Sequence, residues 1–275
     1  MSAETTVTLL HPGSMGTAVG EQLRTGGAEV RWVTAGRSEA TRSRAVAAGL
    51  TAVPTLAEAL AGSSLVLSIC PPAFAEDVAK EVAALGFGGL FADANAIAPD
   101  RAGRIAGLMP GRVVDGGIIG GPPRRAGTTR LYLSGPGADV VAALFAGTAL
   151  EAVLLDGPVG KASGLKMAYA SYQKISRVLG AVSHALAREY GVEEHLDREA
   201  ELLDSRPLAD VAAFPGVAAR AWRWGPEMEE AARALREARL PGDIAEGAAL
   251  ALSRWDADKD RTDSTPAEVL DHLLR

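Results

Sequence analysis

The stretch LLHPGSMGTAVG, residues 9–20, decides the fold of this chain. It follows an apolar run, TVTLL, and leads into a segment whose small and apolar residues suit a helix. The stretch predicts a strand that ends at Leu10, a tight turn HPGSMG, and a helix that opens near Thr17. A strand, a glycine-rich turn and a helix in this order make the unit that binds a dinucleotide.

The turn matches the G-x-G-x-x-G pattern with His11 at the first glycine, Gly13 at the second and Gly16 at the third. Backbone N–H groups at such a helix start hold a pyrophosphate, so the dinucleotide contacts are expected from Gly13, Ser14, Met15 and Gly16. A glycine-rich turn of this length can also be a simple corner. A negative φ at His11 would explain why glycine is dispensable, whereas a positive φ would indicate strain.

The rest of the first half alternates short apolar runs with longer Ala-rich segments that carry charges at helical spacing. This rhythm predicts parallel βαβ units, with strands covered by helices on both faces. Helices are expected over residues 38–49 and 72–86. The expected strands are residues 6–10, 29–33, 64–69, 89–94, 112–117, 129–135 and 152–156.

The strand signal stops after Val159, and the pattern is helical from there to Arg275. Breaks are expected at Gly191, Pro207, Pro215, Pro241 and Pro266. The fold class is therefore α/β followed by all-α. The predicted domains are residues 1–158, which bind the dinucleotide, and residues 159–275, which are helical and serve substrate binding and dimerisation.

Residues 161–190 contain no proline and have apolar residues on several helical faces. At 1.5 Å per residue, one helix of this length would span about 45 Å, which is more than a small domain encloses. We expect a central helix shared with a second subunit, and therefore a homodimer through the C-terminal helices.

Composition narrows the possible partners of this chain of 275 residues. The net charge is −6 and the basic residues are spread among acidic ones, which argues against nucleic acid. The single cysteine, Cys70, cannot form an internal disulfide, and no secretory signal is evident. No apolar stretch reaches the roughly 20 residues of a membrane span. A cytoplasmic protein that acts on a small-molecule substrate, without a metal site, is expected.

The second expected strand runs into TAGRSEATRSR, residues 34–44, and no carboxylate stands at its tip. An NAD-selective protein would place Asp or Glu there to bind the ribose. Arg37 and Ser38 occupy the position instead, with Arg42 and Arg44 further along. A guanidinium suits a 2′-phosphate, so NADP is expected in preference to NAD. The alternative is a solvated helix face, which fits Arg42 and Arg44 better than Arg37.

Lys166 lies about four residues into the expected central helix. A positive charge near the start of a buried helix is unfavourable, because it lies at the positive end of the helix dipole and loses hydration, so its presence requires an explanation. It is either a functional group or a long side chain that reaches solvent at a domain junction, and residue chemistry alone leaves both open.

Three separated motifs resemble those of the β-hydroxyacid dehydrogenase superfamily, which includes 3-hydroxyisobutyrate and 6-phosphogluconate dehydrogenases. They are HPGSMG at residues 11–16, DGGIIGG at residues 115–121, and GPVGKASGLK at residues 157–166. The resemblance covers nearly the whole chain. More closely, GRS at 36–38, FADANAIAP at 91–99, DGGIIGGPP at 115–123 and AWRWGPEMEE at 221–230 are similar to a subgroup of NAD(P)-dependent oxidoreductases with a C-terminal domain of unknown function.

The resemblance implies hydride transfer between the nicotinamide and a substrate carbon, with Lys166 at the position of the catalytic lysine. It places Asn95 near nicotinamide and substrate. It also places Cys70, Pro71 and Pro72 in a loop that borders the cofactor. We interpret Cys70 as a packing residue, because no histidine follows at a suggestive position.

Two departures from the family pattern concern the substrate. The family's substrate-binding segment Ser-Gly-Gly corresponds to Ile119, Gly120 and Gly121 in this chain, so its serine is replaced by Ile119. The asparagine that the family has four residues after the lysine is replaced by Ala170. A less polar substrate is expected, or one held by other groups. Candidates for those groups are Tyr169 and Gln173. The resemblance aligns Glu227 with a family aspartate that lines the site, beside Trp222, Arg223 and Trp224, although ordinary interface packing is the preferred interpretation of the two tryptophans.

These observations favour an NADPH-linked reductase or dehydrogenase that acts on a carbonyl or alcohol. Imine reductases share the architecture but generally lack the lysine, so imine reduction is the first alternative. A dinucleotide-binding regulatory protein without turnover is the second.

Overall fold

The computed structural model describes residues 5–203, 207 and 209–275. The chain divides into two compact units, Met1–Ala170 and Ser171–Arg275, each of which is described by itself. The division falls inside the long helix α7 (Lys161–Glu189). The domain limits expected from the sequence, 1–158 and 159–275, stay a prediction.

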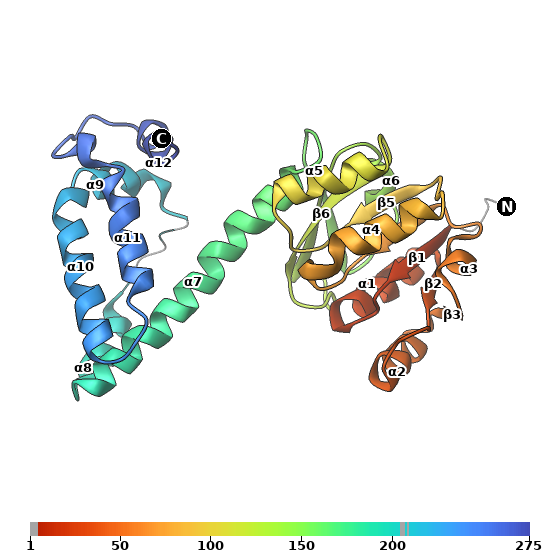
Figure 1. Ribbon diagram of the computed structural model, residues 1–275, viewed down its shortest axis with the longest axis horizontal. Helices are drawn as coiled ribbons and strands as arrows, with labels where there is room; N and C mark the ends of the chain where they lie inside the picture. The colour runs from red at the N-terminus through yellow and green to blue at the C-terminus, as the bar shows by residue number, and fades with distance from the viewer. Residues whose placement is uncertain (1–4, 204–206, 208) are drawn as a thin grey trace. The chain divides into compact units, whose positions relative to one another are not determined.

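The first unit is built on an eight-stranded sheet with the order β3-β2-β1-β4-β5-β6-β7-β8. Figure 1 shows the strands of this unit from β1 in red to β6 in yellow. The order reverses direction between β1 and β4, as in doubly wound dinucleotide-binding sheets. The strands are β1 (Thr6–Leu10), β2 (Glu29–Val33), β3 (Thr51–Val53), β4 (Leu65–Ser68), β5 (Leu90–Asp93), β6 (Val113–Gly120), β7 (Thr129–Ser134) and β8 (Leu150–Leu154).

Strand direction differs from the sequence-based expectation at one edge. Strands β1 to β6 are parallel, but β7 pairs antiparallel with β6, with Gly120 opposite Thr129 and Asp115 opposite Ser134. Residues 121–128 join the two strands directly, and such a hairpin makes antiparallel neighbours. The three-residue strand β3 was missed because it is short and largely exposed.

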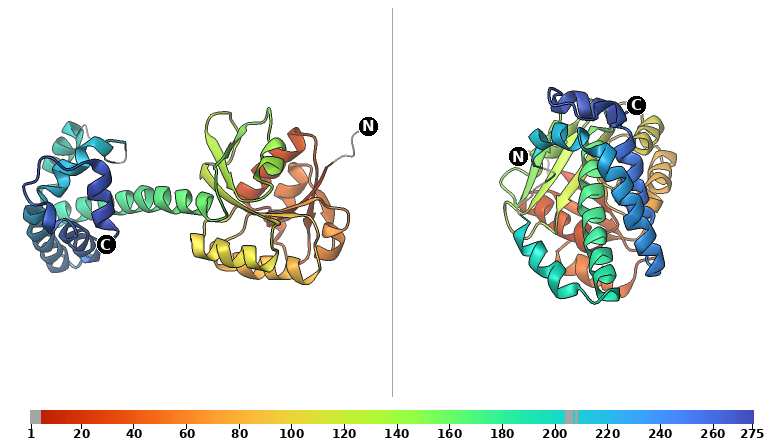
Figure 2. Two further views of the ribbon diagram at one scale, coloured as in Figure 1. Left: turned by 90° about the horizontal axis from the view of Figure 1, so that it is seen from above. Right: turned by 90° about the vertical axis from the view of Figure 1, so that its left-hand side faces the viewer.

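Helices cover both faces of the sheet, as expected, and each face has its own core. Val19 of α1 and Val141 of α6 belong to one core, and Val82 of α4 and Ile105 of α5 belong to the other. The left view of Figure 2 shows α4 and α5 together on one face. The helices are α1 (Ser14–Thr25), α2 (Glu39–Ala47), α3 (Leu56–Leu60), α4 (Ala75–Ala84), α5 (Pro99–Leu108) and α6 (Ala138–Ala143), with a 3-10 turn η1 at Pro72–Phe74.

The second unit is all-helical, as expected. After α7 come α8 (Glu193–Leu202), η2 (Val211–Ala213), α9 (Phe214–Ala218), α10 (Ala221–Glu237), α11 (Asp243–Ser253), η3 (Asp256–Asp258) and α12 (Pro266–Leu273). Within the described residues, no helix is both long and apolar enough to cross a membrane.

The expected helix breaks are confirmed only in part. Gly191 separates α7 from α8 with a φ of 67°, and Pro241 lies between α10 and α11. Pro215 and Pro266 instead lie in the first turns of α9 and α12. Proline is tolerated there because an N–H in the first turn has no intrahelical acceptor.

Candidate functional site

The carboxyl ends of β1 and β4 lie side by side where the strand order switches, and Ile69 N donates to Leu10 O at 3.2 Å. Ligands of open α/β sheets bind in the crevice at this switch point. The turn after β1 and the loop after β4 therefore define the candidate dinucleotide site.

The turn after β1 leaves open space beside Gly13, whereas at Gly16 two backbone segments come into close contact. A Cβ at Gly16 would lie 2.6 Å from His11 O, whereas one at Gly13 would have no atom within 4 Å. Helix α1 begins at Ser14, not at Thr17, because Gly13 is its N-cap. No side chain caps this end and no acidic residue lies in its first turn, so the arrangement fits an anionic pyrophosphate.

Ser14 is exposed beside the open side of Gly13, and Met15 is half-buried against the sheet core. The geometry gives Met15 a packing role, and its predicted contact with the cofactor stays a prediction.

His11 has a φ of 68°, in the left-handed region. The residue keeps the backbone conformation that a glycine would adopt there without strain. The positive φ therefore indicates backbone strain at His11, the second of the two outcomes considered from the sequence.

Arg37 follows β2 and is half-buried. Desolvation lowers the pKa of its guanidinium, and interaction with Glu81 opposes that lowering. Its Nε is shielded from solvent and has no hydrogen-bond partner in the described part of the chain. Arg37 also acts electrostatically on His11 and on Cys70, so it lies near both the turn after β1 and the loop after β4.

The neighbouring arginines bind protein atoms. Arg42 donates to the carbonyl oxygens of Arg37 at 3.3 Å and Thr34 at 3.0 Å, and so braces the loop that carries Arg37. Arg44 donates to Thr41 Oγ1 at 3.1 Å. Ser38 Oγ accepts from Thr41 N and caps α2. These contacts favour Arg37 over Arg42 and Arg44 as the ligand-binding arginine.

Asn95 is 2% exposed, and its amide joins two loops of the site. Its Oδ1 accepts from Cys70 N at 2.6 Å, and its Nδ2 donates to Ser68 Oγ at 3.1 Å and to Asp93 Oδ2 at 2.9 Å. The geometry makes Asn95 a positioning residue for the loop after β4, and its direct contact with a nicotinamide stays a prediction.

Asp93 and Cys70 are both shifted by burial. Burial raises the pKa of Asp93 to about 6, with a further rise from the charge of Asp115 and opposing hydrogen bonds from Asn95. Burial also raises the pKa of the Cys70 thiol. A thiol held protonated is a poor nucleophile, which supports the interpretation of Cys70 as a packing residue.

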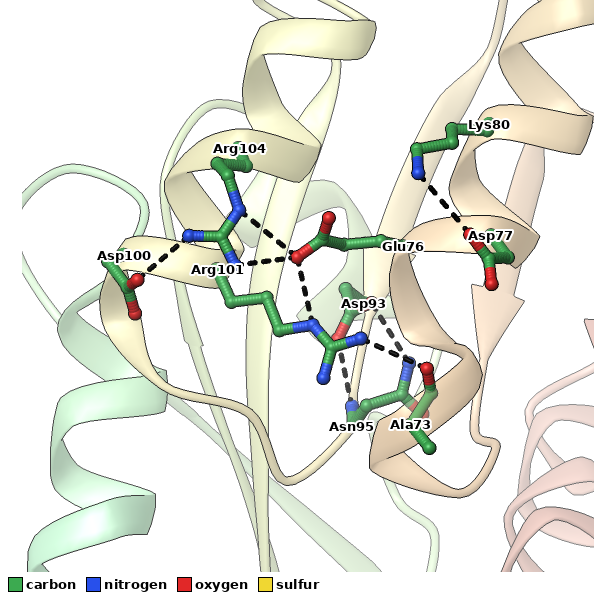
Figure 3. Close-up of polar contacts among 9 residues, drawn as sticks. All are labelled: Ala73, Glu76, Asp77, Lys80, Asp93, Asn95, Asp100, Arg101 and Arg104. Carbon is green, nitrogen blue, oxygen red and sulfur yellow. Dashed lines mark hydrogen bonds and ion pairs between the residues drawn. The ribbon is translucent and has the colours of Figure 1, made fainter.

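The loop that contains Pro71 and Pro72 is anchored by ion pairs between α4 and α5 (Figure 3). Arg101 donates to Glu76 Oε1 at 2.9 Å and to Ala73 O at 3.0 Å, and Arg104 reaches Glu76 Oε1 at 2.7 Å. The hydrogen bond from Arg104 is the main reason that the pKa of Glu76 is lowered. These contacts fix the border of the crevice.

Asp115 organises the start of α7, and the sequence reading missed this role. Its buried carboxylate accepts from Gly160 N at 2.8 Å, Ser163 N at 3.0 Å, Ser163 Oγ at 2.5 Å and Ser134 Oγ at 3.1 Å. Asp115 belongs to the motif DGGIIGG, but its type and spacing do not show that its carboxylate meets the start of α7, 45 residues further along the chain.

Lys166 lies one turn further along α7, where the helix packs closely on β6. A Cβ at Gly117 would lie 2.8 Å from Ala162 O and 3.1 Å from Lys166 Cβ, so glycine permits this approach. The partly exposed Lys166 donates from Nζ to Ile118 O at 2.6 Å. The ammonium group is thus held beside the expected substrate residues 119–121.

Residues 119–121 were expected to form a loop, but two of the three belong to a strand. Strand β6 extends through Ile119 to Gly120, which has a φ of 124°, because both pair with β7. Ile119 is 5% exposed and lies on the same face of β6 as Asp115 and Gly117, the face that α7 covers. Gly121 alone follows the strand, and its carbonyl accepts from Thr129 Oγ1 at 2.6 Å.

Tyr169 is half-buried on α7 within the first unit, and Ala170 is buried beside it. Gln173 and Glu227 belong to the second unit, on α7 and α10, and their assignment to the site stays a prediction.

Trp222 makes its contacts inside the second unit. Lys259 Nζ lies 4.1 Å from the centroid of its ring, and its Nε1 donates to Asp260 Oδ1 at 3.3 Å. Arg223 lies 5.6 Å from the same centroid, and Trp224 is half-buried. Packing therefore accounts for Trp222. In the part of the chain that is described, no group of three or more His, Cys, Asp or Glu residues could hold a metal ion.

Comparison with known proteins supports the fold. The family model of DUF1932, a domain of unknown function, matches residues 187–255, so the expected C-terminal domain of unknown function is confirmed. No curated protein matches the chain.

Solved structures match almost the whole chain. A reductive aminase from Aspergillus terreus in complex with NADPH and ethyl levulinate has 20% identity over 99% of this chain and 100% of its own, with a TM-score of 0.70. A conserved hypothetical protein from Sinorhizobium meliloti has 25% identity over 100% and 97%, with a TM-score of 0.56. A conserved protein of unknown function with structural similarity to 3-hydroxyacid dehydrogenases has 22% identity over 92% and 98%, with a TM-score of 0.59. The chain thus has the Rossmann fold with a helical C-terminal region that such reductases and dehydrogenases share.

Proposed function

We propose that this chain is an NADP-dependent oxidoreductase that transfers hydride between the nicotinamide and a small carbonyl or hydroxy substrate. The observation that carries the proposal is the position of Lys166, whose Nζ is held 2.6 Å from Ile118 O beside residues 119–121. A lysine fixed near the carboxyl end of β6, at the same edge of the sheet as the dinucleotide crevice, is suited to proton transfer.

The cofactor supplies or accepts the hydride when it is bound. The open backbone at Gly13 and the uncapped start of α1 would hold its pyrophosphate, and Arg37 would bind the 2′-phosphate. The loop with Cys70, Pro71 and Pro72 would border it. The fold relatives support a dinucleotide, and the arrangement around Arg37 supports NADP.

Lys166 would exchange one proton at Nζ with the substrate oxygen. In the oxidative direction, the alcohol loses its hydroxyl proton to Nζ and its carbon-bound hydrogen as hydride, which leaves a carbonyl. The Ile118 carbonyl accepts a hydrogen bond from Nζ and thereby orients the remaining lone pair or N–H. Ile119 and Ala170 add apolar surface, which favours a substrate less polar than a small hydroxy acid.

Imine reduction is a second candidate, favoured by the similarity in fold to a reductive aminase bound to NADPH. Lys166 favours carbonyl reduction over imine reduction, because a carbonyl oxygen must gain a proton when the carbon accepts hydride, whereas an iminium nitrogen is already protonated. A dinucleotide-binding protein without turnover is the third candidate.

We further propose a homodimer through the C-terminal helices. Ile175, Val178 and Leu179 are exposed on α7 although they are large and apolar. Within the second unit, a groove of about 690 Å³ is lined mainly by apolar residues of α7, α8, α10 and α11. Exposed apolar surface of this kind marks an association site.

The experiment that tests the function has two parts. Fluorescence titration measures the binding of NADPH and NADH, and NADPH oxidation is then followed across aldehydes, ketones, keto acids and preformed imines. Turnover of a carbonyl supports the proposal, and turnover of imines alone supports the second candidate. Tight NADPH binding with no turnover across the panel would leave the third.

A further inference from the structure

The backbone at His11 has a φ of 68°, which glycine adopts freely and a side chain adopts at a cost. The close approach in this turn is made by Gly16 against the His11 carbonyl, so it involves the backbone of His11 and not its imidazole. A strained non-glycine residue in a ligand-binding turn points to a use for its side chain.

The imidazole is partly buried, and its Nδ1 is shielded from solvent and makes no hydrogen bond of good geometry among the described residues. The backbone of Leu10 opposes the lowering of its pKa, so the Leu10 carbonyl is the nearest protein acceptor. The Nε of Arg37 is likewise shielded from solvent and has no hydrogen-bond partner among the described residues. The charge of Arg37 lowers the pKa of His11, so the two side chains lie close enough to interact, and each has a buried nitrogen atom without a hydrogen bond of good geometry among the described residues. Unpartnered buried polar atoms are rare in folded proteins and call for an explanation.

We infer that His11 and Arg37 together hold a phosphate monoester, the 2′-phosphate of NADP, and that His11 is a cofactor-specificity residue. This inference rests on the proposed function. A phosphate offers several acceptor oxygens, so it can accept a hydrogen bond from each of two neighbouring nitrogen donors. The pyrophosphate has its own place at Gly13 and the start of α1.

The surrounding charges fit this assignment. Burial, together with the charge of Arg37, lowers the pKa of His11 to about 4, so the free ring is neutral at pH 7 and lies beside Arg37 without repulsion. A neutral imidazole with its proton on Nδ1 still donates a hydrogen bond. Arg42 and Ser38, the other polar groups of this region, already bind backbone atoms of residues 34–41.

The test compares His11→Gly and His11→Asn with the wild-type protein. Binding of NADP⁺ and NAD⁺ is measured by titration calorimetry, and 2′-AMP serves as the probe of the phosphate alone. Loss of one hydrogen bond to a charged group predicts about tenfold weaker NADP⁺ and 2′-AMP binding for His11→Gly, with NAD⁺ unchanged. His11→Asn, whose amide can donate and whose backbone tolerates a positive φ, should recover part of the loss.

Thermal unfolding separates this role from a structural one. His11→Gly relieves the positive φ, so its melting temperature should equal or exceed that of the wild type. Unchanged NADP⁺ binding by this variant, or an equal loss for both dinucleotides, overturns the inference while the proposed function stands. A wild-type protein that binds neither dinucleotide overturns both.

Discussion

Ser163 donates twice to Asp115, from its hydroxyl to Oδ1 at 2.5 Å and from its backbone N–H to Oδ2 at 3.0 Å. The carboxylate of Asp115, near the start of β6, is therefore the N-terminal anchor of α7. Lys166 lies one helical turn beyond this anchor, so the position of its Nζ depends on it.

Asp115→Asn should destabilise the protein by about 3 kcal/mol, because an amide cannot accept from all of the buried donors that meet the carboxylate. Chemical denaturation measures the change in the free energy of unfolding. Ser253→Ala, which removes an exposed hydroxyl on α11, is the control and should have little effect. Equal stability of Asp115→Asn and wild type would show that the anchor is not important.

Lys166→Met should reduce turnover by about 100-fold or more, the range of general acid–base catalysis, and leave NADPH affinity within a few-fold. Steady-state kinetics and cofactor titration measure the two effects. Lys174→Met, at an exposed position on the same helix, should behave as the wild type. An active Lys166→Met variant would remove this lysine from the mechanism.

Arg37→Ala should weaken NADPH by about tenfold to a hundredfold and NADH far less, because only NADPH carries the 2′-phosphate. Arg42→Ala is the matched comparison. Arg42 braces the loop backbone through Thr34 and Arg37, so its loss should affect both dinucleotides alike. Equal losses of both cofactors in Arg37→Ala would contradict the assignment.

Much of the first unit could be predicted from the sequence because its signals are local. The strand that ends at Leu10 and the change to helix after β8 follow from short patterns of apolar residues, glycine and proline. The antiparallel β7 was missed although its signal is local: residues 121–128 are too few for the crossover that parallel neighbours need.

The site could be predicted only in part. Lys166, Arg37 and the glycines stand out by type and spacing, and the structure places Lys166 beside residues 119–121. The φ of His11 and the internal use of the Asn95 amide depend on contacts between segments distant in sequence. Residue types alone do not specify these contacts.

Asp93 should make stability fall as pH rises. Its pKa in the folded protein is about 6, above the ordinary 3.8, so folding favours the protonated form. Below pH 3.8, Asp93 is protonated in both the folded and the unfolded protein and does not change the free energy of unfolding. As the pH rises above that value, its ionisation lowers the free energy of unfolding, by about 3 kcal/mol at neutral pH. Asp93→Asn should lack this term when free energies of unfolding are compared at about pH 4 and about pH 7.5. Parallel pH profiles of variant and wild type would contradict it.

The exposed apolar side chains of α7 are expected to form the interface of a homodimer. Leu179 is 45% exposed and Ile175 is 53% exposed, so a charge at either position is tolerated by an isolated chain but not at a buried interface between subunits. The wild type should be a dimer by light scattering at micromolar concentration, and Ile175→Glu with Leu179→Glu should be a monomer with an unchanged circular dichroism spectrum.

Val46→Glu is the matched control, because Val46 is also exposed and apolar but lies on α2 in the other unit. This variant should remain a dimer, which would assign the interface to the helical unit and not to exposed apolar surface in general. A monomeric wild type would contradict the proposed dimer. A dimer that survives both charges on α7 would place the interface elsewhere.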